Sequence, residues 1–333
     1  MEEGTLVQGR YRLLGLLGRG GMGEVWRAED EALGRHVAVK CLRTGAVLHD
    51  PGQAQLQLER FRREARVAAG LQHPGITVVH DFGYAGGAPY FVMELLDGSD
   101  LGQLLDGLPR RRMPVEQAVD TARQIASALA YTHARDVIHR DLKPANLIRT
   151  TVGGIKICDF GIARLRGGGG ATSRFAAGGS PVGTPRYMSP EQINEGDLDA
   201  RTDLYSFGCV LYELLLGDPP FTVGDPLVIM LDHRDTPPRP PRELRPEIPE
   251  DLERIVLALL AKDPDDRPAD AMAVLRSLNE VARPRRRTAA PLPPWARRMG
   301  PVPVTLVRVT PEARGVAELT RRWPRAAQPV HRS

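Results

Sequence analysis

The hydrophobic pattern of this chain changes from mostly strand-like to mostly helical close to Asp97-Gly98. Before that point, short runs rich in β-branched, aromatic and leucine residues predict strands over residues 11–18, 24–30, 36–42, 76–84 and 89–95. After it, apolar residues recur at helical spacing, most clearly at Val115, Ala118, Val119, Ala122, Ile125, Ala126 and Leu129. A smaller sheet-rich part followed by a larger helical part predicts an α+β fold with two lobes and a crevice between them.

The two lobes are expected to span residues 1–96 and 97–282. Residues 166–180 are rich in glycine and show no periodicity, which predicts a flexible loop inside the second lobe. Helix start and stop signals predict further helices over residues 51–70, 202–217, 249–261 and 269–282.

Positive charge is concentrated at the C-terminal end of the sequence. Residues 283–333 contain nine prolines, twelve arginines and two glutamates, which predicts a disordered tail with a charge balance of +10. Because the whole chain has a net charge of +4, the residues before the tail have a net charge of −6. We therefore expect no specific nucleic-acid partner for the folded part, whereas the tail has the charge to contact acidic surfaces.

The longest apolar run covers only residues 255–261, and a bilayer span requires roughly 18 residues. The first ten residues are acidic and lack an apolar centre, so they do not predict a secretory signal. Cys41, Cys158 and Cys209 are odd in number and widely spaced, as is typical of free thiols in a reducing compartment. We therefore expect a cytoplasmic protein without a transmembrane segment.

Gly18, Gly20 and Gly23 form a G-x-G-x-x-G pattern, which occurs both in phosphate-binding loops and in ordinary turns. The residues after Gly23 alternate as in a strand, whereas a dinucleotide-binding fold requires a helix there. The sequence contains no Gly-Lys dipeptide, which excludes a Walker-type loop. We therefore expect a lid that joins two strands and offers backbone N–H groups to phosphate oxygens.

Only four of the 45 basic residues are lysines, namely Lys40, Lys143, Lys156 and Lys262. In a chain that so strongly prefers arginine, a lysine can mark a site that needs a compact ammonium group. Lys40 ends a predicted strand and would point toward the glycine lid, where Glu64 on the predicted helix could hold it. The alternative for Lys40 is an ordinary exposed lysine at a strand end, and Lys156 and Lys262 are interpreted as incidental.

The most specific segment is VIHRDLKPANLI, residues 137–148, which is followed by Asp159-Phe-Gly. Asp141, Asn146 and Asp159 bring oxygen atoms that can converge near Lys143, and such a set suits Mg²⁺ and a polyphosphate. The alternative is that residues 137–148 and Asp159-Phe-Gly form two unrelated surface turns. That would require a coincidence at both segments and at the glycine lid. We therefore interpret these residues as a binding site for a metal-bound polyphosphate.

In combination, these motifs resemble those of eukaryotic-type serine/threonine protein kinases, especially the bacterial Hanks-type members, over about residues 7–282. The motifs follow one another in the expected order: GRGGMGEV, VAVK, Glu64, HRDLKPAN, DFG and SPE. The resemblance implies a bilobal fold. It also implies an enzyme that transfers the γ-phosphoryl group of ATP to Ser or Thr hydroxyls of proteins, with Mg²⁺ or Mn²⁺ as cofactor.

The resemblance implies a role for each matching residue. Asp141 would accept the proton of the substrate hydroxyl, and Lys143 would offset charge on the transferring group. Asn146 and Asp159 would hold the metal ions, and Lys40, paired with Glu64, would hold the α- and β-phosphates. The implied nucleotide-binding residues are the lid glycines Gly18, Gly20 and Gly23, the apolar residues Leu17, Val25 and Ala38, the gatekeeper Met93, and the backbone of Glu94 and Leu96.

Two acidic residues outside this set are also expected to matter. Ser189-Pro190-Glu191 stands where the family usually has Ala-Pro-Glu, and Glu191 is still expected to pair with Arg267. Asp203 would either cap its helix or, as the resemblance implies, anchor the loop that carries Asp141.

Many bacterial relatives carry threonines where this chain has Ala176 and Gly178. The remaining acceptors in the glycine-rich loop are Thr172, Ser173 and Ser180. A phosphate on one of them would bring about two negative charges that can pair with the arginine preceding Asp141. Autophosphorylation of this loop is therefore expected to order it and to raise activity.

Two other classes of function share part of this pattern. A small-molecule phosphotransferase would use the same oxygen-bearing residues, but the segment GTPRYMSPEQ, residues 183–192, favours a protein hydroxyl as acceptor. A binding module or pseudokinase should have lost Lys40, Asp141 or Asp159, and all three are present.

Overall fold

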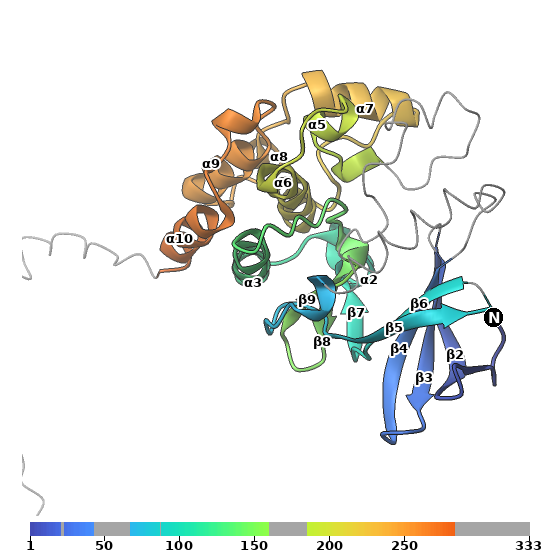
Figure 1. Cartoon of the computed structure of the whole chain (residues 1–333). Helices are drawn as coiled ribbons and strands as arrows, with labels where there is room; N and C mark the ends of the chain where they lie inside the picture. The colour runs from blue at the N-terminus through green and yellow to red at the C-terminus, as the bar shows by residue number, and fades with distance from the viewer. Residues whose placement is uncertain (21–22, 43–66, 87, 160–184, 284–333) are drawn as a thin grey trace, which may run out of the picture. The chain divides into compact units, whose positions relative to one another are not determined.

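The computed structural model describes residues 1–20, 23–42, 67–86, 88–159 and 185–283 (Figure 1). Its first part is an antiparallel sheet in the spatial order β1-β2-β3-β4-β6-β5. The strands are β1 (Leu6–Val7), β2 (Tyr11–Gly20), β3 (Gly23–Asp30), β4 (Arg35–Leu42), β5 (Val79–Ala85) and β6 (Ala88–Glu94). Each of the five runs predicted as a strand lies wholly or largely within one of β2 to β6.

The two faces of this sheet separate the hydrophobic core from the candidate site. Trp26, Val39 and Val92 pair across β3, β4 and β6, and all three are buried in the core of the sheet. Because side chains alternate along a strand, Ala38 and Lys40 lie on the opposite face of β4. Lys40 pairs there with Val25 and Phe91.

A second, smaller sheet consists of β7 (Gly98–Asp100), β8 (Leu147–Thr150) and β9 (Ile155–Ile157). A Cβ at Gly98 would collide with the backbone carbonyl of Arg149, so the pairing of β7 with β8 requires glycine there. Ile76 forms a parallel bridge with Ile157. The strand predicted from residue 76 therefore begins only at Val79, because Ile76 pairs with another part of the chain.

Helices make up most of the described chain after β7 (Figure 1). They are α2 (Leu101–Asp106), α3 (Val115–His133), α5 (Pro190–Ile193), α6 (Ala200–Leu216), α7 (Pro226–Asp235), α8 (Pro241–Leu244), α9 (Glu250–Leu259) and α10 (Ala271–Ala282). Short 3₁₀ turns lie at η2 (Pro109–Arg111), η3 (Pro144–Asn146), η4 (Pro185–Tyr187) and η5 (Pro264–Asp266). The predicted α+β architecture, with a sheet-rich part followed by a helical part, is confirmed.

The helix α6 forms the centre of the second core. Its residues from Thr202 to Leu216 are all buried, and it packs against α3 and α9. The predicted apolar face of α3 is confirmed: Val115 packs against this core, and the other predicted residues belong to it, namely Ala118, Val119, Ala122, Ile125, Ala126 and Leu129. Gly208 gives α9 room to approach, because a Cβ there would lie 2.8 Å from that of Leu259.

Some expectations differ from the structure or lie outside it. The helix α7 was not predicted, because its exposed side chains include the apolar residues Leu227, Val228 and Leu231, which obscure a single apolar face. Of the helix predicted over residues 51–70, only 67–70 are described, and 67–69 are helical. The glycine-rich loop and the tail lie outside the described residues. Among the helices that are described, none is both long and apolar enough to cross a membrane.

Candidate active site

The loop between α3 and β8 carries the most specific sequence motif, and one buried carboxylate holds its backbone. Asp203 on α6 accepts hydrogen bonds from the backbone N–H groups of His139 and Arg140, both at 2.8 Å. Its Oδ2 also lies 2.8 Å from His133 Nε2. These contacts hold Arg140 at a φ of 65°, in the left-handed region that non-glycine residues rarely adopt.

Asp203 is fully buried. Burial by itself would raise the pKa of its carboxyl group, but hydrogen bonds from His133 and from the loop hold that pKa below its usual value. The N-cap of α6 is Asp199, whose side chain accepts from the N–H of Arg201. Of the two roles considered for Asp203, the structure therefore shows the anchor of the loop.

Asp141 lies in a small polar cluster on this loop. Lys143 Nζ donates to Asp141 Oδ2 at 2.9 Å, and Asn146 Nδ2 donates to the Asp141 carbonyl at 2.8 Å. Asn146 Nδ2 also lies 3.4 Å from Asp141 Oδ2. The structure thus brings together the three residues of this loop that the sequence singled out.

His139 links this cluster to the segment that carries Asp159. The N–H of Asp141 donates to His139 Nδ1 at 3.2 Å, and His139 Nε2 lies 2.9 Å from the carbonyl of Cys158. One neutral tautomer satisfies both bonds, with the proton on Nε2. His139 is fully buried, and the contacts of both its ring nitrogens with the backbone give it a structural role.

Lys40 and Asp159 form an ion pair, with Nζ 2.7 Å from Oδ1. They come from strand β4 and from the segment after β9, so residues more than a hundred positions apart meet here. Asp159 has a φ of 56°, a strained backbone for a non-glycine residue, as functional sites often show. Glu64, the predicted partner of Lys40, lies outside the described residues.

Several of the predicted nucleotide-binding residues lie on neighbouring strands of the first sheet. Gly20 pairs with Gly23 at the β2–β3 hairpin, so the glycine lid does join two strands. Ala38 pairs with Met93, and Val25 pairs with Lys40. Leu17 remains 55% exposed, while Gly18 has open space around it.

Glu94 is held by contacts that the sequence did not predict. Its N–H donates to the Val78 carbonyl at 3.0 Å, and its side chain accepts from the Val78 N–H at 2.8 Å. Lys156 Nζ donates to Glu94 Oε1 at 2.5 Å and to the Ile76 carbonyl at 3.2 Å. Lys156, interpreted from the sequence as incidental, therefore fixes the segment that follows Met93 and leads to Leu96.

Lys262 is the second lysine that the sequence did not explain. Its Nζ donates to the carbonyls of Asp232 and His233 at the end of α7 and lies 4.4 Å from the centre of the Phe221 ring. Burial lowers the pKa of this amine to about 8. No local pattern could reveal this role, because the contacts join residues about 30 positions apart.

The predicted metal ligands fit Mg²⁺ by the chemistry of their donor atoms. Asp159 supplies a carboxylate and Asn146 an amide oxygen, both hard oxygen ligands. Within the described residues, no cluster of three His, Cys, Asp or Glu side chains could by itself hold a metal. Two protein ligands are sufficient for an ion that keeps waters and takes its other ligands from substrate phosphates.

The segment after η4 is docked against the loop of Asp141. Ser189 and Gln192 form a capping box at α5, and Gln192 Nε2 donates to the Arg140 carbonyl at 2.8 Å. Glu191 forms the expected pair with Arg267, at 2.8 and 2.9 Å.

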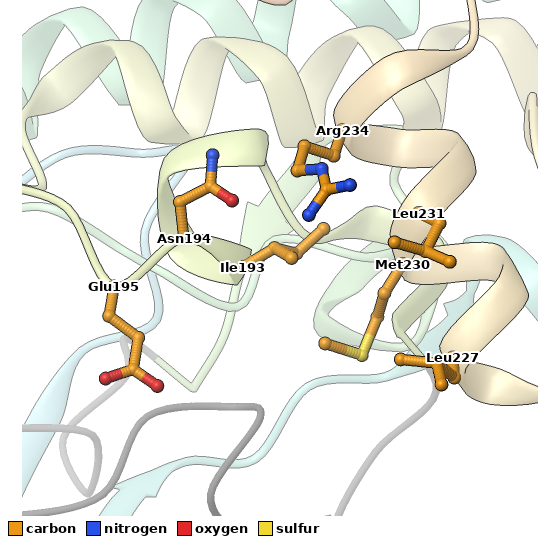
Figure 2. Close-up of a pocket in the computed structure, with 7 residues that line it drawn as sticks. All are labelled: Ile193, Asn194, Glu195, Leu227, Met230, Leu231 and Arg234. Atoms are coloured by element: carbon orange, nitrogen blue, oxygen red, sulfur yellow. The ribbon is translucent and has the colours of Figure 1, made fainter.

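A cavity of about 260 Å³ lies between α5 and α7 (Figure 2). It is remote in the sequence from every residue predicted to belong to the site. It is lined by Ile193, Asn194, Glu195, Leu227, Met230, Leu231 and Arg234. Because none of the converging carboxylates and lysines lines it, it does not contribute to the candidate active site.

The comparisons with known proteins agree with this geometry. The chain is 45% identical over 280 residues to a probable serine/threonine-protein kinase of Streptomyces coelicolor, and 41% identical over 272 residues to the serine/threonine-protein kinase PknB of Mycobacterium tuberculosis. These alignments cover 82% and 80% of this chain but only 40% and 42% of the relatives. The chain thus matches less than half the length of these relatives.

The crystal structure of the PknI kinase domain of Mycobacterium tuberculosis superimposes with a TM-score of 0.66 and 30% identity, covering 85% of this chain and 99% of that one. The family described as "Protein kinase domain" matches residues 11–278. The chain therefore belongs to the protein kinase family, as the resemblance of its motifs implied.

Proposed function

We propose that this protein is an ATP-dependent serine/threonine protein kinase. The observation that carries the proposal is the pairing of Lys143 with Asp141 and of Lys40 with Asp159. His139 bridges the two pairs through the Asp141 N–H and the Cys158 carbonyl. These contacts support the proposal, because they link the candidate base Asp141 to a lysine and a carboxylate of the kind that a metal-bound polyphosphate requires.

In the proposed reaction, the hydroxyl oxygen of the acceptor Ser or Thr forms a bond to the γ-phosphorus of ATP. The bond between that phosphorus and the bridging oxygen of ADP breaks, and the hydroxyl proton passes to the Asp141 carboxylate. Lys143 offsets negative charge on the transferring group, and Lys40 contacts the α- and β-phosphates. Positioning and charge stabilisation carry such a step, because its transition state needs little covalent assistance.

Asp159 and Asn146 would hold Mg²⁺ or Mn²⁺, which neutralises phosphate charge when bound. Leu17, Val25 and Ala38 would cover the purine, Met93 would lie behind it, and the backbone of Glu94 and Leu96 would contact its edge. The lid glycines Gly18, Gly20 and Gly23 would allow close approach to the phosphates. The register of β3, β4 and β6 supports this arrangement.

The relatives support a protein acceptor, because those cited above are named serine/threonine-protein kinases. We further propose, from the sequence, autophosphorylation at Thr172, Ser173 or Ser180, a role for Glu64 as partner of Lys40, and a cytoplasmic location. These three acceptors and Glu64 lie outside the described residues.

The test is to incubate the purified protein with labelled ATP and Mg²⁺, with and without myelin basic protein, and to map phosphorylated residues by mass spectrometry. Asp141→Asn and Lys40→Met should each reduce transfer by at least about a hundredfold, because general-base catalysis and phosphate positioning are typically worth that much. Circular dichroism should show that both variants remain folded. Undiminished transfer in both variants would contradict the assigned roles.

A further inference from the structure

Two adjacent arginines in the turn η2 have an unusual backbone conformation. Arg110 and Arg111 both have a φ of 54°, in the left-handed region that costs energy for residues other than glycine. Such strain persists only where surrounding contacts impose it, so it directs attention to what the turn places.

The contacts that impose this conformation come from the end of α6. Arg112 Nε donates to the Leu216 carbonyl at 3.1 Å, and the Met113 N–H donates to the Leu214 carbonyl at 2.9 Å. Gly217 follows α6, and a Cβ there would lie 2.6 Å from the Arg110 carbonyl oxygen. The side chain of Arg112 and the backbone of Met113, which directly follow the turn, therefore fasten it to the end of α6, and Gly217 leaves room for it there.

The result is that Arg111 reaches a buried carboxylate. Its Nη2 lies 3.5 Å from Oε1 of Glu213, a side chain that is only 4% exposed. Burial raises the pKa of Glu213, and Arg111 and the Tyr187 hydroxyl oppose that rise. Arg111 Nε lies closer to Asp106 Oδ1, at 2.9 Å, and its Nη1 lies 3.7 Å from Asp218 Oδ1. These two carboxylates are 67% and 74% exposed, so solvent screens both contacts.

Glu213 in turn holds the segment that precedes α5. The hydroxyl of Tyr187 donates to Glu213 Oε2 at 2.6 Å. Ser206 Oγ donates to the Tyr187 carbonyl at 2.7 Å. The same segment is fastened to the loop of Asp141 through Gln192, as described above.

We propose that Arg111 is a positioning residue for the protein acceptor. Through its contact with Glu213, it helps to hold that side chain against the Tyr187 hydroxyl, and the segment from Pro185 to Ile193 then presents a fixed surface beside Asp141. This inference rests on the proposed kinase activity and adds to it a residue 30 positions away from the catalytic loop, on a different element.

Arg111→Ala and Arg110→Ala form a matched pair of variants. Both place alanine at the same left-handed φ, so they share the backbone penalty and differ in the contact with Glu213. Arg111→Ala should raise the KM for myelin basic protein about tenfold, the value of one charged hydrogen bond, with kcat and the KM for ATP nearly unchanged. Arg110→Ala should leave the KM for the acceptor unchanged, and Arg111→Lys should restore most of the loss.

Tyr187→Phe provides the second arm. Tyr187→Phe should raise the acceptor KM as Arg111→Ala does. The acceptor KM of the double variant should be no higher than that of either single variant, because both substitutions act through Glu213. Additive effects of the two substitutions on the acceptor KM, or an unchanged acceptor KM in Arg111→Ala, would overturn the inference. Either result would leave the kinase activity established.

Hydrogen exchange provides a readout that does not depend on activity. Residues 185–193 should exchange faster in Arg111→Ala than in Arg110→Ala. Equal exchange in the two variants would also overturn the inference. A wild-type protein that phosphorylates nothing would contradict the proposed function, and the exchange measurement would still decide the role of Arg111.

Discussion

Arg267 donates hydrogen bonds from Nη1 and Nη2 to the two carboxylate oxygens of Glu191, at 2.8 and 2.9 Å. The Arg267 side chain is fully buried and that of Glu191 is 10% exposed. Arg267 also donates to the carbonyls of Ala261, Arg201 and Lys262. One pair of side chains thus ties the segment beside the catalytic loop to α6 and to the region before α10.

Replacing Arg267 with alanine should lower the free energy of unfolding by about 3–5 kcal/mol, because it leaves a buried carboxylate without its partner. Urea unfolding followed by circular dichroism measures this change. Glu243→Gln is the control, since Glu243 and Arg239 form a pair in which both side chains are more than half exposed. That variant should change stability by less than about 1 kcal/mol, and equal losses in the two would contradict the argument.

His233 should make stability depend on pH. Burial lowers its pKa to about 3 in the folded protein, against an ordinary value of 6.5. The unfolded chain therefore binds the additional proton first as pH falls below 6.5, and stability is lost. At pH 4.5 the loss should be about 2–3 kcal/mol relative to pH 7.5.

His233→Gln tests this assignment, because glutamine does not titrate in this range. Unfolding of both proteins by urea at pH 7.5 and 4.5 should show a smaller loss for the variant. Parallel losses in wild type and variant would assign the pH dependence to other groups.

Asp203→Asn should weaken the catalytic loop. The amide has one acceptor oxygen where the carboxylate has two, so the N–H groups of His139 and Arg140 and the side chain of His133 cannot all keep their bonds. We expect a fall of about 1.5–3 kcal/mol in the free energy of unfolding and a lower kcat. Asp199→Asn should change neither, because asparagine caps a helix as well as aspartate does.

Lys156→Met should raise the KM for ATP. The substitution removes the 2.5 Å contact with Glu94 and leaves that carboxylate with its backbone bond to Val78. The connection that carries Met93 and Leu96 then loses one of its supports, and we expect an increase of about three- to tenfold. Steady-state kinetics at varied ATP would measure this KM. Arg239→Met serves as a control at an exposed position. An unchanged KM for ATP in Lys156→Met would show that the contact has no part in binding ATP.

The strands β2 to β6 and the helices α3, α6, α9 and α10 could be predicted because hydrophobic periods and helix start and stop signals are local. Asp141, Lys143 and Asn146 could be assigned for the same reason, since they lie within six residues of one another in one motif. Asp199 and Asp203 show the limit of prediction from local sequence patterns. Both are acidic residues near the start of α6, and the sequence could not decide which one caps the helix and which one holds the loop.

Tertiary structure decided the contacts that join distant segments. Lys156 with Glu94, Lys262 with the end of α7, and Arg111 with Glu213 each depend on the packing of separate elements. Neither charge nor spacing marks these residues, because an arginine or lysine in the sequence is most often solvated. What the sequence determined is therefore which residues are proposed for the site, through short-range patterns. The fold determined which buried charged side chains form pairs, because a carboxylate or a lysine that is buried depends on one partner.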